Sequence, residues 1–131
     1  MNKEEKEILL RDLCNRLPYN VMCQVEFKED GKYNSKVMLL SGIFTDEAYF
    51  TTKGGSIYSN EYKPYLRPMS SMTEEEQRTL DSMCNGVEMV SRLSGLKMFD
   101  KAFNWLDENH FDYRGLIEKG LAIDATGKKI Y

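Results

Sequence analysis

The sequence predicts an α+β fold: a single domain over residues 1–131, with an N-terminal helix, a small curved antiparallel sheet of three to four strands and about three C-terminal helices. Hydrophobic residues alternate in segments between residues 21 and 58, and Asp-Gly and Gly-Gly pairs separate these segments, as in antiparallel hairpins. Helical spacing and capping residues dominate both ends of the chain. A hydrophobic content of 41% is sufficient for a core without disulfides or metal.

The first element is expected to be a helix over residues 4–17. Asn2 and Glu5 have the spacing of a reciprocal capping box at its N-terminus. Pro18 ends the helix, because its ring disfavours helical geometry at the preceding residue and it has no amide hydrogen to donate. The buried side of this helix is predicted to be a leucine stripe made of Leu9, Leu10, Leu13 and Leu17.

A hairpin of two strands is expected next. Residues 21–28 alternate between hydrophobic and polar side chains, and Asp30-Gly31 supplies the positive φ angles of a tight turn. Residues 36–44 are hydrophobic on both faces from residue 37 to residue 40, which predicts a central strand whose second face is covered by helices. Gly42 predicts a bend or bulge in that strand.

A second hairpin is expected where residues 49–52 and 56–58 flank Lys53-Gly54-Gly55, and a polar turn at residues 45–47 would join the two hairpins. A Gly-Gly pair can also hold a phosphate group. That interpretation requires a following helix N-terminus or a G-x-x-x-x-G-K pattern, and the sequence has neither, so the turn is favoured.

The segment at residues 62–72 is predicted to be ordered, extended and irregular, because Pro64 and Pro68 prevent a helix. It carries aromatic and basic side chains at Tyr62, Lys63, Tyr65 and Arg67. Such side chains can stack on bases and hold phosphates. The favoured interpretation is that the tyrosines and Leu66 hold a connecting loop against the core, since no wider basic face accompanies them.

Thr73 and Glu76 form a second capping box and predict that a helix begins here. Its hydrophobic stripe is expected to contain Leu80, Met83, Cys84 and Val87. Asn85-Gly86 is expected to end or bend this helix. Residues 87–96 are assigned to a short helix ending near Ser94-Gly95, although an edge strand at residues 89–91 fits equally well.

A further helix is expected from residue 99 to about residue 109, with a stripe of Phe99, Ala102, Phe103 and Leu106. Trp105 lies off this stripe and is interpreted as a second contact or an exposed anchor. Asp112 is positioned to cap another helix over residues 113–119, which Gly120 would end. Residues 124–131 are expected to form a polar tail.

The sequence completes no recognised catalytic or metal-binding motif. Cys14, Cys23 and Cys84 form no C-x-x-C pair and are interpreted as reduced core residues. His110 is the single histidine, and neither a G-x-S-x-G elbow nor an H-E-x-x-H repeat accompanies it. It is interpreted as a helix-end residue that donates to a carbonyl, with its charge favoured by the helix dipole. We therefore predict no catalytic residue, metal or cofactor.

The net charge and the N-terminal segment indicate which partners and which cellular location to expect. A net charge of -3, with 30% charged residues of mixed sign, argues against broad attraction to a phosphate backbone and leaves only a small local basic patch open. The hydrophobic run within residues 1–13 is too short for a signal peptide or a membrane span. We expect a cytoplasmic protein that has no membrane partner.

Three stretches resemble a family of short uncharacterised proteins of gut Bacteroides and relatives, often carried on prophages or other mobile elements. The stretches are DLCNRLPYNV at residues 12–21, KPYLRPMSSMTEEE at residues 63–76 and HFDYRGLIEKGLAIDA at residues 110–125. The strands and residues 86–103 match this family only loosely. The resemblance implies a bacterial, intracellular protein and transfers no catalytic residue.

We expect a noncatalytic accessory protein, a protein-interaction module whose surface combines residues 62–72 with the turn at residues 110–114. The alternative is a nucleic-acid-associated factor that uses the segment 62–67 together with Arg114, and an enzyme with a site near His110 ranks third. Neither the protein partner nor the oligomeric state is predicted. The candidate binding residues are Tyr62, Lys63, Tyr65, Arg67, Trp105, His110 and Arg114.

Overall fold

The computed structural model describes residues 2–44, 47–84 and 92–131, and its main helices are α1 (Lys3–Arg16), α2 (Glu74–Cys84) and α3 (Arg92–Glu108). Single 3-10 turns follow α1 and the fifth strand, at Leu17–Tyr19 and Met69–Ser71. The strands are β1 (Met22–Glu29), β2 (Lys32–Ile43), β3 (Ala48–Thr52), β4 (Gly55–Ser59), β5 (Tyr62–Pro68), β6 (Phe111–Asp112) and β7 (Ile123–Asp124). No helix in these ranges is long and apolar enough to cross a membrane.

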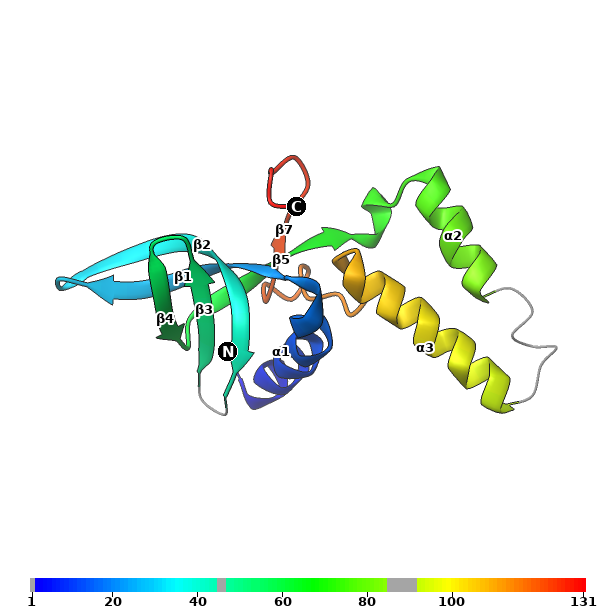
Figure 1. Cartoon of the computed structure of the whole chain (residues 1–131), viewed down its shortest axis with the longest axis horizontal. Helices are drawn as coiled ribbons and strands as arrows, with labels where there is room; N and C mark the ends of the chain where they lie inside the picture. Colours follow the sequence, from blue (N-terminus) through cyan, green and yellow to red (C-terminus); the bar gives the residue numbers. More distant parts are fainter. Residues whose placement is uncertain (1, 45–46, 85–91) are drawn as a thin grey trace.

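The strands form one mixed sheet in the order β4-β3-β2-β1-β5-β6, with β7 also paired to β5 (Figure 1). Pairs among β1 to β5 are antiparallel, and β6 and β7 pair with β5 in parallel. The α+β class is confirmed, but the expected three to four strands are too few, because the described residues contain seven. The extra strands are β5, which was expected to be irregular, and β6 and β7, which are too short for any periodicity to predict them.

β5 accommodates its two prolines through their positions in the strand. Pro64 is the last residue of β5 aligned with β1, and Pro68 ends the strand. Beyond Pro64, the strand turns to new partners: Arg67 N donates to the His110 carbonyl at 2.7 Å, and the Leu66 carbonyl accepts from Ala125 N at 2.8 Å. Proline is tolerated in a strand where no ladder bond requires its amide hydrogen.

α1 begins and ends as predicted. Glu5 N donates to Asn2 Oδ1 at 2.8 Å, Asn2 N donates to Glu5 Oε2 at 3.2 Å, and the helix gives way to a 3-10 turn at Leu17-Pro18. The leucine stripe is only partly buried, because Leu10 remains 38% exposed. The core lies between α1, the inner face of the sheet and the turns after β6. Its larger side chains are Leu9, Leu13, Val21, Val25, Leu40, Phe50, Leu66, Leu116 and Leu121.

The turns of the sheet also follow the prediction. Asp30 and Gly31 both have positive φ angles, 52° and 78°, and Gly42 lies at a register shift between β2 and β3. The expected helical cover over the second face of β2 is not found among the described residues, where Val37 on that face remains 40% exposed. α1 packs against the other face of this part of the sheet, through Leu9 and Leu13. The polar turn predicted at residues 45–47 falls mainly on positions outside the described residues.

α2 and α3 form a helical pair that projects from the sheet and α1 (Figure 1). Glu76 N donates to Thr73 Oγ1 at 3.1 Å and Thr73 N to Glu76 Oε1 at 3.0 Å, so the predicted capping box is present. α3 is one helix from Arg92, and the predicted helix end near Ser94-Gly95 is therefore wrong. The predictions for residues 85–91, an end or bend at Asn85-Gly86 and the start of a short helix or edge strand, lie outside the described residues.

Residues 113–119 do not form the predicted helix. Gly115 and Gly120 have φ angles of 72° and 74°, and the chain between them forms successive turns. The Asp112 carboxylate does act as a cap, since it accepts from the amides of Leu116 and Ile117 at 2.8 and 2.9 Å. A capping residue was therefore recognised correctly, but it caps turns rather than a helix.

The first hairpin turn provides a test of backbone strain. A Cβ added at Gly31 would meet no atom within 4 Å, so Gly31→Ala is strained only by the positive φ angle. We expect it to lower the free energy of unfolding by about 1 kcal/mol. Gly54→Ala is the control, because it has equal space and no positive φ angle. Urea unfolding of both variants measures the difference, and equal effects would contradict the prediction.

Candidate functional site

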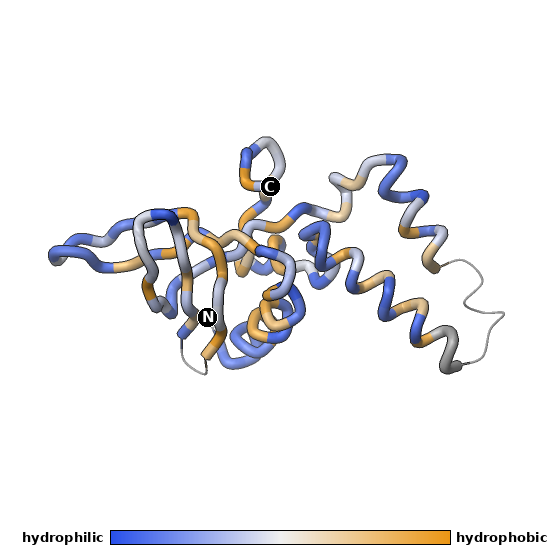
Figure 2. Tube along the Cα trace, in the orientation of Figure 1, coloured by the Kyte–Doolittle hydropathy of each residue, from blue (hydrophilic) through white to orange (hydrophobic). Residues whose placement is uncertain are grey.

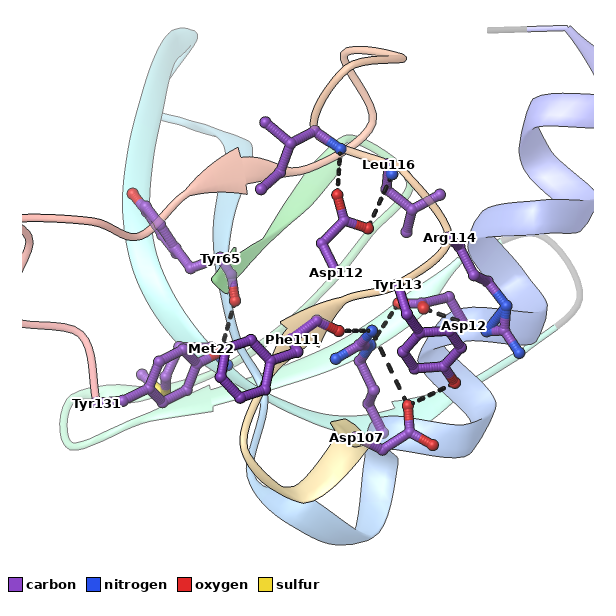
Figure 3. A network of polar contacts seen from close by, with 12 residues as sticks. Asp12, Met22, Tyr65, Asp107, Phe111, Asp112, Tyr113, Arg114, Leu116 and Tyr131 are labelled. Atoms are coloured by element: carbon purple, nitrogen blue, oxygen red, sulfur yellow. Dashed lines mark hydrogen bonds and ion pairs between the residues drawn. The ribbon is translucent and has the colours of Figure 1, made fainter. Parts of the chain in front are cut away.

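A buried ionic cluster joins α1, α3 and the turn after α3 (Figure 3). Arg16 is 0% exposed; its Nε donates to Asp12 Oδ2 at 2.7 Å, and its Nη2 donates to the Phe111 carbonyl at 2.6 Å. Asp107 Oδ1 lies 3.9 Å from the same Nη2. A buried guanidinium requires such partners, because removal from water is costly for an unpaired charge.

Tyr113 and Arg114 complete this cluster. Tyr113 Oη donates to Asp107 Oδ1 at 2.8 Å, and Arg114 Nη1 lies 3.2 Å from Asp12 Oδ1. Burial raises the pKa of Asp107, and burial together with the Asp107 hydrogen bond raises the pKa of Tyr113 to about 12. Arg114, a predicted binding residue, is thus engaged in holding the turn against α1.

A second ion pair connects β5 to the start of α2. Arg67 Nη1 and Nη2 donate to the two carboxylate oxygens of Glu76 at 2.8 and 2.7 Å, and the Arg67 side chain is 28% exposed. The Arg67 hydrogen bond lowers the pKa of Glu76 to about 2. The guanidinium carbon also lies 4.1 Å from the centre of the Phe111 ring, and Trp105 stacks with that ring at 5.7 Å. Arg67 and Trp105 therefore contribute to packing at the base of the helical pair.

His110 follows α3 with a φ angle of 64° and stacks on Tyr131, with ring centres 3.5 Å apart and an interplanar angle of 9°. Burial, with the positive charges of Arg16 and Arg67, lowers its pKa to about 4. The expectation of a favoured positive charge is therefore wrong, because burial and two cations outweigh the helix dipole. The buried Nδ1 atom of His110 has no hydrogen-bond partner among the described residues. This nitrogen therefore does not donate to a carbonyl, as the sequence had led us to expect.

A pocket of about 590 Å³ lies beside this stack, and its lining includes Arg67, Ser71, His110, Lys128 and Tyr131. Ser71 Oγ donates to the Pro68 carbonyl at 2.6 Å, so this hydroxyl is not paired with the imidazole as a nucleophile would be with its base. The pocket is lined by the imidazole of His110, by the basic side chains of Arg67 and Lys128 and by the carboxylate of Glu108, and Arg67 is paired with Glu76. Within the described ranges no group of three or more His, Cys, Asp or Glu side chains could hold a metal ion.

The remaining predicted residues lie elsewhere. Tyr62 is half-buried, with its ring centre 5.1 Å from that of Phe50, and it lines a separate pocket of about 650 Å³ with the exposed Lys63. Tyr65 is only 7% exposed, and its carbonyl accepts from Tyr131 Oη at 2.8 Å. The structure thus brings Arg67 and His110 together at one pocket and Tyr62 and Lys63 together at another.

A hydrophobic surface that the sequence did not predict runs along α3. It consists of Leu96, Phe99 and Phe103, which are 66%, 43% and 47% exposed, and we name it the α3 stripe. Phe99 and Phe103 were expected to be buried with Ala102 and Leu106, but only the latter two are, at 4% and 5% exposure. Periodicity identified the hydrophobic side of the helix correctly. It could not reveal that the neighbouring elements cover only part of it.

Comparisons of the chain with protein-family models, with curated proteins and with solved structures found no match in any of the three. The residues and their geometry therefore carry the functional argument.

The buried cluster predicts a large effect of removing its cation. Arg16→Met leaves the carboxylates of Asp12 and Asp107 without their buried partner, and we expect a loss of about 3 kcal/mol or more in the free energy of unfolding. Arg11→Met in the same helix is the control, since Arg11 is exposed. Chemical denaturation measures both variants, and a small effect at Arg16 would mean that the cluster does not hold α1 to α3.

His110 predicts a loss of stability in mild acid. Its pKa rises from about 4 in the folded protein to the ordinary 6.5 on unfolding, so the unfolded chain binds more protons between these values. The stabilising contribution is complete above pH 6.5 and is lost as the pH falls towards 4. His110→Asn, which tolerates a positive φ angle, should lose less stability over this interval. Thermal unfolding at several pH values measures this, and parallel curves for both proteins would refute it.

Proposed function

We propose that this chain is a noncatalytic protein-interaction module, a small bacterial accessory protein that acts in the cytoplasm through the α3 stripe. The observation that carries the proposal is the exposure of Leu96, Phe99 and Phe103 on one side of a helix that projects from the body of the protein. Contiguous exposed hydrophobic surface on a soluble protein is typical of a contact site.

The extent of the hydrophobic side of α3 supports this proposal. An α-helix turns by about 100° per residue, and on this wheel the hydrophobic side chains of α3 occupy about half of the circumference. Met98 and Trp105 lie at one edge of this arc, and Leu96 lies at the other. Ala102 and Leu106 are buried, and Met98 and Trp105 are half-buried, so neighbouring elements cover one part of this arc. The other part is the α3 stripe. A partner that covered it would remove aromatic surface from water, which is the dominant favourable term in association.

The two alternative functions receive less support. Binding of nucleic acid through residues 62–67 would require free aromatic faces and unpaired cations, yet Tyr65 is buried and Arg67 is paired with Glu76. An enzyme near His110 would require a base matched to a nucleophile, whereas the pKa of His110 is lowered to about 4 and Ser71 is bonded to a backbone carbonyl.

The proposal is tested by capture on the wild-type protein and on two variants. Phe99→Ser removes the central side chain of the α3 stripe, and Tyr58→Ser removes a more exposed aromatic, 55% against 43%, from the sheet. In a lysate of a gut Bacteroides species, we expect cross-linked adducts on wild type and Tyr58→Ser that are lost on Phe99→Ser. Mass spectrometry identifies each adduct, and binding is then measured between purified proteins.

The supporting result is direct binding by purified components that Phe99→Ser weakens about tenfold or more, the loss of a central aromatic contact. Circular dichroism should show Phe99→Ser folded, because the side chain is already partly in water. Binding that survives Phe99→Ser and fails with Tyr58→Ser would place the contact on the sheet and overturn the proposal.

A further inference from the structure

We propose that the Tyr131 side chain lies in a binding site for tyrosine, from which a tyrosine of a partner peptide displaces it. We name this site the tyrosine slot; it is formed by the backbone of Met22, the backbone of Tyr65 and the ring of His110. Residues 126–131 form a strap that carries the resident occupant. The slot shares no residue with the α3 stripe and gives the protein a second means of binding a partner.

The hydroxyl group of Tyr131 stands in place of a hydrogen bond of the sheet. Hydrogen-bonded pairs alternate along an antiparallel ladder, and Glu26 N donates to the Glu61 carbonyl at 2.9 Å. Continued along the register of β1 and β5, this alternation makes Met22 and Tyr65 a hydrogen-bonded pair. Instead, Tyr131 Oη accepts from Met22 N at 2.9 Å and donates to the Tyr65 carbonyl at 2.8 Å (Figure 3). The two strands thus present one donor and one acceptor at the spacing that a single hydroxyl group bridges.

The walls of the tyrosine slot belong to the body of the protein rather than to the strap. Met22 also pairs with β2 and Tyr65 with β7, so other strands hold both backbone groups in place. His110 is held as well, because its carbonyl accepts from Arg67 N at 2.7 Å. Its ring lies against that of Tyr131, with ring centres 3.5 Å apart and an interplanar angle of 9°. The slot is therefore formed independently of its occupant, which favours the binding of a free ligand.

The strap is attached to the body mainly by its tyrosine. Ala125 N donates to the Leu66 carbonyl at 2.8 Å, and from residue 126 to residue 130 the hydrogen-bonded amides donate to acceptors within residues 124–128. Among the described residues, only the Tyr131 hydroxyl group joins the strap to the body by hydrogen bonds. The strap is mostly hydrophilic (Figure 2), so hydrophobic packing adds little to its attachment. Release of one side chain therefore frees the whole strap.

Space for a partner peptide lies next to the slot. The pocket of about 590 Å³ has one wall on the body, with Glu108, Asn109 and His110, and another on the strap, with Thr126 and Lys128. When the strap leaves, the wall on the body stays beside the slot. The residues that flank the tyrosine of a peptide can lie against this polar wall, because a peptide backbone carries both donors and acceptors.

The contacts of the slot define which side chain it selects. A ligand has to supply a flat ring for the imidazole and a hydroxyl proton for the Tyr65 carbonyl. Phenylalanine lacks the hydroxyl group, and phosphotyrosine places a charged phosphate where that proton is required. Unmodified tyrosine meets both requirements, as Tyr131 does.

The free molecule p-cresol, which is the tyrosine side chain alone, tests the slot in Tyr131→Ala. We expect p-cresol to bind Tyr131→Ala about tenfold or more tightly than wild type, because the strap occupies the slot in wild type. Toluene, which lacks the hydroxyl group, should bind about tenfold more weakly than p-cresol. Tyr58→Ala is the matched control, since it removes a tyrosine that is 55% exposed on the sheet and should bind p-cresol as wild type does. Ligand-observed NMR measures all of these affinities.

The signals of His110 report where p-cresol binds. His110 is the single histidine, and the stacked ring of Tyr131 shifts the resonances of its ring protons. Tyr131→Ala should move these resonances, and p-cresol should return them towards their wild-type positions. If circular dichroism shows Tyr131→Ala unfolded, Tyr131→Phe decides instead: its strap keeps the ring without the hydroxyl bonds, so p-cresol should bind it more tightly than wild type.

Short peptides added to wild type test the displacement of the strap. Acetyl-Gly-Tyr-Gly-amide should bind, and its phenylalanine and phosphotyrosine counterparts should bind about tenfold more weakly. Equal binding of p-cresol and toluene to Tyr131→Ala, or His110 resonances that p-cresol leaves unmoved, would overturn the slot. Equal binding of the three peptides would overturn the displacement. Phe99→Ser should change none of these results, so failure of the slot is distinguishable from failure of the α3 stripe.

Discussion

The fold depends on the burial of one charge, the guanidinium of Arg16. A fully buried cation requires partners, and here they come from three separate places. Asp12 in α1 itself and the Phe111 carbonyl in β6 accept its hydrogen bonds, and the Asp107 carboxylate near the end of α3 lies 3.9 Å from it. These contacts fix the position of the C-terminal end of α3 against α1 and β6. None of the side chains in Glu74–Cys84 is fully buried, so α2 receives its position mainly from α3 and from the Arg67–Glu76 pair.

Features determined within a few residues could be predicted from the sequence. The capping boxes at Asn2 and Thr73, the turn at Asp30-Gly31 and the bulge at Gly42 each depend on local backbone geometry, and each is present. Features determined by distant residues could not. β5 is a strand despite two prolines because β1, β6 and β7 supply its partners, and those pairings span long distances in the sequence.

The candidate site illustrates the same division. Arg67, His110 and Arg114 are polar or basic side chains near turns, a pattern typical of binding residues. In the structure each of them contacts a side chain of the same protein that sequence patterns did not pair with it. Glu76 holds Arg67, Tyr131 stacks on His110, and Asp12 holds Arg114. Conversely, Phe99 and Phe103 were expected in the core because hydrophobic spacing indicates which side of a helix is apolar, and only the surrounding structure decides whether that side is covered.

Trp105 gives the protein a built-in optical reporter. It is the single tryptophan of the chain, it is half-buried on α3, and it stacks on Phe111, the residue that also contacts the Arg67 guanidinium. Its emission therefore originates at the junction between the projecting helices and the sheet. Without any added label, the tryptophan fluorescence of this protein reports the solvation of that junction.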